Sequence, residues 1–470
     1  MLNLCGTPTA LHYKFMKNVK TIGLLFSVLL SFSVQGQSKQ WTLEECVKYA
    51  IENNISIKLS DLDTQTAEIN KKDAFGNYLP SVSGTASHSW NVGLNVNPVT
   101  NIAATTTTQY SSMGAGLGVD IYKGLQNQNT MRKQKLALIA SQYQLTKMQE
   151  DVALNVANAF LQVLFNKQNL KVQQEQLAIN QKQQLRSDEM VKAGSIPRGD
   201  LLDVKATVAT SQQNVIAAEN TLLISKLSLA QLLQLKEFAN FDVADENTFQ
   251  DENNILEQTP MEVYNKAKET RTELKIAQTN LEIAEKNLAI ARGAYQPTLQ
   301  GFYNINTRIS YADVPFVQAD GSIGTTGAPP FWEQFSDNKG HAFGVQLSVP
   351  IFNGFATRNN VERTRVDLER SKIDLQQKEL DLQRNVYTAF TDAKGALKAH
   401  ESAIVALEAR QEAFNYAKEK FEVGLMNSFD FNQAQTLYTN AQSEVLRSKY
   451  DYIFKIKILE FYFGIPIIQK

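Results

Sequence analysis

The sequence predicts an α+β membrane protein in which long coiled-coil helices are joined to four transmembrane β-strands, and in which one structural unit is used twice. Three observations predict this class: an internal repeat, helices longer than a compact domain can hold, and four segments in which apolar and polar residues alternate. Four strands cannot close a barrel, and an open sheet edge in lipid leaves backbone groups unsatisfied, so several copies must associate.

The internal repeat relates residues 42–235 to residues 259–465. Two constant offsets align the copies, 217 positions before the strands and 230 positions after them. Matching pairs include Ala50 with Ala267 and Pro80 with Pro297 at the first offset, and Gly194 with Gly424 and Asp200 with Asp430 at the second. The difference of 13 positions predicts an insertion between Pro297 and Phe352. Such a repeat supplies two parts of one larger symmetric object.

Residues 1–36 are interpreted as a secretory signal peptide. Lys17 and Lys20 precede an apolar run, and a small-residue cleavage site ends at Gly36. The alternative is a membrane anchor helix, which needs about 20 apolar residues. Met16 is a candidate initiator, in which case residues 1–15 are an extension. Cleavage leaves Cys46 as the one mature cysteine, expected to pack in the core.

The mature chain is expected to hold two repeats and a linker. The first repeat, residues 37–235, contains a helix, a β-hairpin at 80–123 and long helices. An acidic linker at 236–258 leads to the second repeat, residues 259–470, with a helix, a β-hairpin at 297–352 and long helices.

The helices are bounded by caps and by Gly or Pro. Thr42 to Glu45 form a capping box, and helices are predicted at 42–75, 126–193, 199–235, 260–294, 357–423 and 428–463. The two longest span about 100 Å at 1.5 Å per residue, and the shorter ones about half of that, so a stacked pair would match one long helix. A coiled-coil seam is visible at Val386, Phe390, Ala393, Leu397, His400, Ile404 and Leu407. Ser428 is the predicted cap of the last helix.

The strands are predicted at 81–96, 111–122, 298–311 and 342–351, each with apolar residues on one face and polar residues on the other. Their length suits tilted transmembrane strands with one face toward lipid and one toward a lumen. The alternative is a soluble two-sheet sandwich. The segment 311–340 is expected to be an external loop, with Phe316, Phe331, Trp332 and Phe335 as candidate sealing residues.

Composition and motifs argue against other classes. The formal net charge of −1 gives no electrostatic case for nucleic acid. The four histidines are too scattered to form a ligand set, and no nucleophile elbow, P-loop or cysteine pair occurs. The sequence therefore predicts no enzyme, no cofactor and no metal site.

Two segments carry a family resemblance. KFEVGLMNSFDFNQAQTLYTNAQSEV at 420–445, and MVKAGSIPRGDLLDVKATVATSQQNV at 190–215, resemble the helical tips of the TolC family of outer-membrane efflux channels. The resemblance implies a homotrimer with a 12-stranded β-barrel and a periplasmic helical tunnel. It implies passive export of small molecules through an outer membrane, with a periplasmic adaptor and an inner-membrane pump as partners. A type I protein-secretion channel and a secreted coiled-coil protein without transport function are the alternatives.

The resemblance also locates the functional residues at the tips of the helical hairpins. Asp430 falls on the first acidic gate position and Gln433 on the second, while Asp200 and Asp203 are their counterparts in the first repeat. A ring of like charges at a constriction would attract cations, although Asp430 could instead serve only as a helix cap. Two residues that bond across the closed tip in some members are replaced by Phe421 and Met426, so closure would need other contacts, such as apolar ones. The adaptor is expected to contact Gly194, Ser195, Ile196, Gly424, Leu425 and Met426, although the glycines could serve only to end helices.

Overall fold

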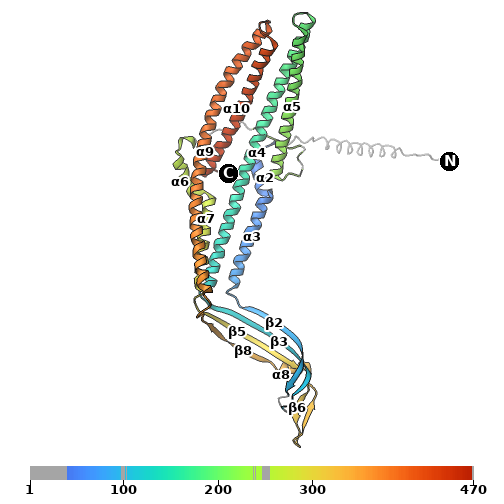
Figure 1. The fold of residues 1–470 in the computed structure, drawn as a ribbon, viewed down its shortest axis with the longest axis vertical. Coiled ribbons are helices and arrows are strands. Elements are labelled where there is room, and N and C mark those ends of the chain that lie inside the picture. The colour runs from blue at the N-terminus through green and yellow to red at the C-terminus, as the bar shows by residue number, and fades with distance from the viewer. Residues whose placement is uncertain are drawn as a thin grey trace, which may run out of the picture.

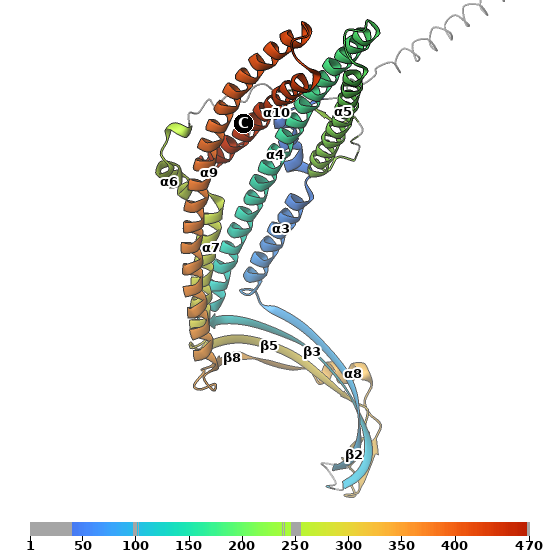
Figure 2. The same cartoon turned by 45° about the horizontal axis from the view of Figure 1, so that its top comes forward.

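The computed structural model describes residues 40–96, 101, 103–236, 238, 240–245 and 255–467. The signal peptide and much of the acidic linker lie outside the described residues. The chain is strongly elongated, with helices at one end and a curved sheet at the other (Figure 1). The rotated view in Figure 2 shows the two helical hairpins side by side, with their turns farthest from the sheet.

The first repeat places two short helices and one medium helix along one long helix. Its elements are α2 (Leu43–Asn53), α3 (Ile55–Gly76), β2 (Ser81–Val96), β3 (Ala103–Lys123), α4 (Gln126–Lys192) and α5 (Arg198–Leu233). α3 lies beside the half of α4 nearest the sheet, and α5 lies beside the other half (Figure 1). The predicted stacking of short helices along a long one is therefore confirmed.

The second repeat has the same arrangement. Its elements are α6 (Pro260–Thr270), α7 (Thr272–Gly293), β5 (Thr298–Ser310), β8 (Gly340–Ser348), α9 (Ala356–Glu422) and α10 (Ser428–Phe463). A parallel pair of two-residue strands, β1 (Gln40–Trp41) and β4 (Asp242–Val243), and a short 3-10 helix, η2 (Ile255–Glu257), flank the helices.

The first helix of each repeat is broken, which corrects the continuous helices predicted at 42–75 and 260–294. The breaks fall at Asn54 and Arg271, which are equivalent under the repeat, and both residues have extended backbone. Asn54 accepts a hydrogen bond from the Ser56 backbone and donates one to the Leu232 carbonyl. Neither break contains Gly or Pro, although Asn54 is itself a favourable helix-capping residue. The capping box at Thr42 is present as predicted.

The two repeats have equivalent cores. Val156 in α4 and Val386 in α9 are both fully buried, as are Cys46 in α2 and its counterpart Val263 in α6. Cys46 thus occupies a valine position, and its interpretation as a core residue is confirmed.

The predicted seam of α9 holds only in part. Val386 and Ala393 are buried, but Ile404 is 46% exposed, and the buried face continues instead through Ala396 and Ala403. The buried face keeps a seven-residue repeat, but its second position lies one residue earlier than predicted, at Ala389, Ala396 and Ala403.

The strands form one antiparallel sheet in the order β2-β3-β5-β8. Its register places the predicted apolar residues of all four strands on the same face. In one row, Val82 lies opposite Leu117, Leu117 opposite Tyr303, and Tyr303 opposite Phe343. β3 begins at Ala103, earlier than the predicted strand at 111–122, because it pairs with the full length of β2.

The inserted segment 311–340 has regular structure of its own. It forms a small hairpin, β6 (Val314–Val317) and β7 (Ile323–Thr326), and a short helix, α8 (Phe331–Asp337). Gln334 in α8 bonds both the N–H and the C=O of Ser310, and Asn338 donates to the Arg308 carbonyl. These side chains of α8 and its C-cap therefore bond the backbone groups of β5 that lie beyond its pairing with β8.

Candidate functional site at the helical tips

The helical hairpins turn through two equivalent glycines. Gly194 and Gly424 have φ angles of 71° and 76°, the left-handed conformation that glycine adopts without strain. In the first turn Ser195 N–H donates to the Met190 carbonyl, and in the second Leu425 N–H donates to the Lys420 carbonyl. Both are Schellman motifs, so the helix-ending role of these glycines is confirmed.

The six predicted contact residues lie together at these turns. Ser195 and Leu425 are exposed, Leu425 by 77%, whereas Ile196 and Met426 are half-buried. The turns therefore present a small surface with one large apolar side chain. Their contact with an adaptor stays a prediction.

Asp430 lies in the first turn of α10 and takes part in its cap. The cap residue is Asn427, which corrects the prediction of Ser428, a side chain that is buried instead. Asp430 N–H donates to Asn427 Oδ1 at 2.8 Å, and Asn427 Nδ2 donates to Asp430 Oδ2 at 2.9 Å. The carboxylate also offsets the positive end of the helix dipole. One oxygen is held by Asn427, and the exposed group remains able to face an ion.

The other predicted gate residues lie near the first turns of α10 and α5. Gln433 is exposed one turn further along α10. Asp200 is half-buried in the first turn of α5, and Asp203 is exposed one turn beyond it. α5 and α10 are joined at this level by Asn432, whose amide donates to Thr207 Oγ1 at 3.3 Å. Asp430 in α10 and Asp200 in α5 therefore lie in the first turns of two helices that start at the same end of the molecule.

An apolar cluster fills the second hairpin just behind its turn. We call it the tip cluster, and it consists of Phe414, Ala417, Phe421, Met426, Phe431, Ala434 and Tyr438. The Phe421 and Phe431 rings stack with centroids 4.7 Å apart, and the Phe414 and Tyr438 rings stack at 5.2 Å. The tip cluster therefore includes Phe421 and Met426, and it joins α9 to α10.

A polar seam joins the two hairpins, and sequence reasoning missed it. Along α4, residues alternately three and four apart are all amides or serine: Asn166, Asn169, Gln173, Gln176, Asn180, Gln183 and Ser187. Asn180, 4% exposed, accepts from Gln435 Nε2 of α10 at 2.7 Å and donates to Ser211 Oγ of α5. The alternating spacing of three and four residues could have revealed this seam, because it is typical of coiled-coil packing whether the side chains are apolar or polar.

The polar seam borders a cavity of about 700 Å³ between α4, α5 and α10. Its walls carry mostly Asn, Gln and Thr side chains. Amide groups can exchange their mutual hydrogen bonds for bonds to water at a net cost of about 1 kcal/mol each. The two hairpins are therefore held by contacts that cost less to open than an apolar seam of the same length.

Arg186 makes a further contact between the hairpins near their turns. Its guanidinium donates to the Glu422 carbonyl at 3.1 Å and lies 3.5 Å from the Glu422 carboxylate. Both side chains are about two-fifths exposed, so the pair is worth little on its own.

The geometry defines a class of protein: an elongated chain with one four-stranded sheet, apolar on one face, and two long helical hairpins. Among the described residues, no group of His, Cys, Asp and Glu could hold a metal ion. None of the described helices has the length and hydropathy needed to cross a membrane.

The chain belongs to the outer membrane efflux protein family, whose model matches residues 47–234 and 263–457. The two matched segments correspond to the two repeats. The resemblance and the expectation that the chain is a channel component, not an enzyme, are therefore confirmed.

Solved structures show the same fold at low identity. A membrane protein from Pseudomonas aeruginosa is 15% identical with a TM-score of 0.74, and 90% of each chain is covered. The CmeC outer membrane channel of Campylobacter jejuni is 18% identical with a TM-score of 0.71, covering 90% of this chain and 85% of CmeC. The outer membrane protein VceC of Vibrio cholerae is 13% identical with a TM-score of 0.71, covering 90% and 96%. Comparison with curated proteins yields no match.

Proposed function

We propose that three copies of this chain form the outer-membrane exit duct of a tripartite efflux pump, which passively conducts small molecules from the periplasm to the exterior. The sheet supplies one third of a transmembrane barrel, and the helices form a periplasmic tunnel. One observation carries this proposal: within one chain the two repeats contact each other through α4 on α7 and through β3 beside β5.

The sheet supports a position in lipid. Val82, Phe343 and Val345 on its apolar face are between 66% and 79% exposed in the single chain. Such a face is stable in contact with acyl chains, and the opposite, polar face suits a water-filled lumen. Among the described residues, no further strand pairs with the outer sides of the edge strands β2 and β8. In lipid these edges must be paired by further copies.

The contacts between repeats indicate how copies would join. Within the chain, α4 packs on α7 and β3 pairs with β5. Under the repeat, α9 corresponds to α4, α3 to α7, β8 to β3, and β2 to β5. A second copy that repeats the same junction therefore packs its α3 on α9 and pairs its β2 with β8. Repetition of one such step closes a ring.

The surfaces that this step would bury carry unpartnered apolar residues at heptad spacing. On α9 they are Val366, Ile373, Leu380 and Tyr387, and on α3 they are Ile55, Leu59, Leu62 and Ile69. Thr272 and Thr279, the α7 counterparts of Ile55 and Leu62, are buried in the junction within the chain. The α3 residues are more than half exposed at the same positions. These stripes fit helix packing against another copy.

The tips are the proposed gate. Asp430 from each copy would form a ring of three carboxylates that favours cations, with Gln433 beside it and Asp200 and Asp203 on the neighbouring hairpin. The tip cluster would keep the second hairpin rigid, while the polar seam would allow it to separate from the first. The exposed turns at Gly194 to Ile196 and Gly424 to Met426 would meet the adaptor.

Planar-bilayer conductance of the purified protein tests this function. We expect discrete channels that prefer cations, and we expect Asp430→Ala to reduce this preference without loss of assembly. Asp451→Ala, which removes an exposed carboxylate of the same helix far from the tip, is the matched control. Absence of channels from a correctly assembled protein would contradict the duct, whereas unchanged cation preference in Asp430→Ala would remove only the gate assignment.

A further inference from the structure

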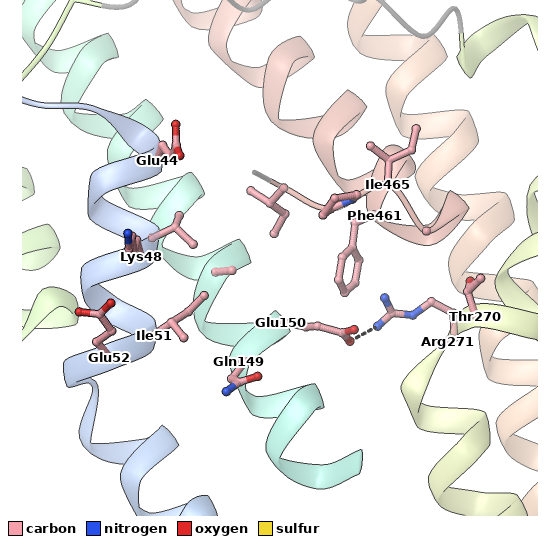
Figure 3. Close-up of a pocket in the computed structure, with 15 residues that line it drawn as sticks. Glu44, Lys48, Ile51, Glu52, Gln149, Glu150, Thr270, Arg271, Phe461 and Ile465 are labelled. Atoms are coloured by element: carbon pink, nitrogen blue, oxygen red, sulfur yellow. Dashed lines mark hydrogen bonds and ion pairs between the residues drawn. The ribbon is translucent and has the colours of Figure 1, made fainter. Parts of the chain in front are cut away.

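An apolar cavity within the described part of the chain has no part in the duct as described above. It measures about 830 Å³ and is lined by residues of both repeats (Figure 3). Its apolar walls come from Val47 and Ile51 of α2, Ala153 of α4, and Phe461 and Ile465 at the end of α10. This volume is within the range of cavities that bind small organic molecules.

Arg271 and Glu150 form the charged floor of this cavity (Figure 3), and Glu273, which does not line it, completes a triad behind them. Arg271, 3% exposed, binds the Glu273 carboxylate through Nε and Nη2 at 3.1 and 3.0 Å. The same Nη2 also donates to Glu150 at 3.2 Å, and the guanidinium lies 3.8 Å from the Phe461 ring centroid. One cation thus serves two carboxylates, and the triad has a net charge of −1.

The excess negative charge belongs mainly to Glu150. Glu273 takes two of the guanidinium hydrogen bonds, whereas Glu150 takes one and a hydroxyl bond from Thr272. Burial raises the pKa of the Glu150 carboxyl, with Arg271 opposing, so the ionised form is incompletely compensated. Figure 3 shows Glu150 reaching from α4 toward Arg271, with the labelled Phe461 side chain nearby.

The internal repeat shows that the fold does not require these charges. The positions equivalent to Arg271 and Glu150 in the other repeat are Asn54 and Leu380, which are uncharged. An anionic floor has therefore been built into one of two equivalent junctions. The cavity rim adds Glu44 and Glu52 against Lys48, so acidic groups outnumber basic ones there as well.

We propose that this cavity is a binding site for a lipophilic organic cation, with the apolar body held between α2 and α10 and the positive charge beside Glu150. The Phe461 ring, over which Arg271 already lies, supplies apolar wall for the body of the ligand. The site lies far from the tips along α4 and does not depend on the gate assignment.

Binding of tetraphenylphosphonium tests the proposal, with tetraphenylborate as the control of similar size and opposite charge. Equilibrium dialysis would use the assembled protein in zwitterionic lipid nanodiscs, with protein-free nanodiscs subtracted. We expect one phosphonium site per chain and at least tenfold weaker binding of the borate. Glu150→Gln, which leaves Arg271 paired with Glu273, should weaken phosphonium binding at least tenfold.

Two further variants keep the test decisive. Ile467→Trp fills the cavity from the segment that follows α10, without altering a helix, and should also abolish binding. Asp430→Asn changes the acidic group at the tips and should leave binding unchanged. Equal binding of both ions, retention of binding in Glu150→Gln, or loss only in Asp430→Asn would overturn the proposal. Failure of the wild-type assembly to bind either ion would also overturn the proposal. This is the result expected if a second copy of the chain fills the cavity.

Discussion

Replacement of Arg271 by Met should destabilise the assembled protein strongly. The guanidinium is almost completely buried and links α7 to α4 across the junction of the two repeats. Its removal leaves two carboxylates without their cation, and breaking a buried pair in this way costs about 3–5 kcal/mol. The Glu150 and Glu273 side chains are 30% and 34% exposed, so water can partly rehydrate them. We therefore expect a loss near the lower limit, about 3 kcal/mol.

Thermal unfolding of the detergent-solubilised protein, followed by circular dichroism, measures this effect. The matched control is Arg365→Met, because Arg365 pairs with Glu362 on the surface of α9 with both side chains more than half exposed. Such a pair is worth at most about 1 kcal/mol. Combining Arg271→Met with Glu150→Gln and Glu273→Gln should recover much of the loss. Equal melting temperatures for Arg271→Met and Arg365→Met would refute the assignment of Arg271 as the residue that holds the junction.

Three other predictions concern the tips and the junction. Phe431→Ala should cost about 3–5 kcal/mol by opening a void in the tip cluster, and should raise leak current in planar bilayers; an unchanged leak would separate the cluster from the gate. Asn180→Leu should cost about 1–3 kcal/mol because it leaves the buried Gln435 amide unsatisfied, and should speed hydrogen exchange of α10 near the tip; protection equal to wild type would argue against the polar seam as the link between hairpins. Burial raises the pKa of the Glu150 carboxyl, so its contribution to stability is present below the unfolded pKa and is lost as pH rises through the folded pKa. Melting temperatures measured across this pH range should therefore fall for wild type relative to Glu150→Gln. A difference between the two proteins that does not change with pH would contradict this.

Most element boundaries were predictable because strong local signals mark them. Gly194 and Gly424 end the long helices, and Thr42 begins the first short one. The alternation of apolar and polar residues fixed which face of each strand is apolar, and the register then aligned those faces. The break at Asn54 had a local signal, because Asn is a good helix cap and its side chain accepts from the Ser56 N–H. The break at Arg271 had none, because Arg271 makes no side-chain cap and instead bonds Glu150, which is distant in sequence.

The candidate site was predictable in position but not in its contacts. The residues of both turns were located from the repeat and from the glycines. The cap at Asn427 was misassigned to its neighbour, because Asn and Ser are comparably good caps. The polar seam was missed because Asn and Gln on a helix are ordinarily interpreted as solvated. Its heptad spacing becomes informative only when a second hairpin is known to pack there.

Disulfide cross-linking between copies tests the central claim, that the junction between repeats is reused between chains. Glu150 bonds Thr272 within the chain at 3.2 Å, so the repeat predicts that Leu380 of one copy contacts Ile55 of the next. In a Cys46→Val background, oxidation of a chain carrying Ile55→Cys and Leu380→Cys should give covalent dimers and then a covalently closed trimer. The control pair Ile55→Cys with Val405→Cys, both exposed, should stay monomeric. A chain with the first pair that remains monomeric after complete oxidation would contradict the ring.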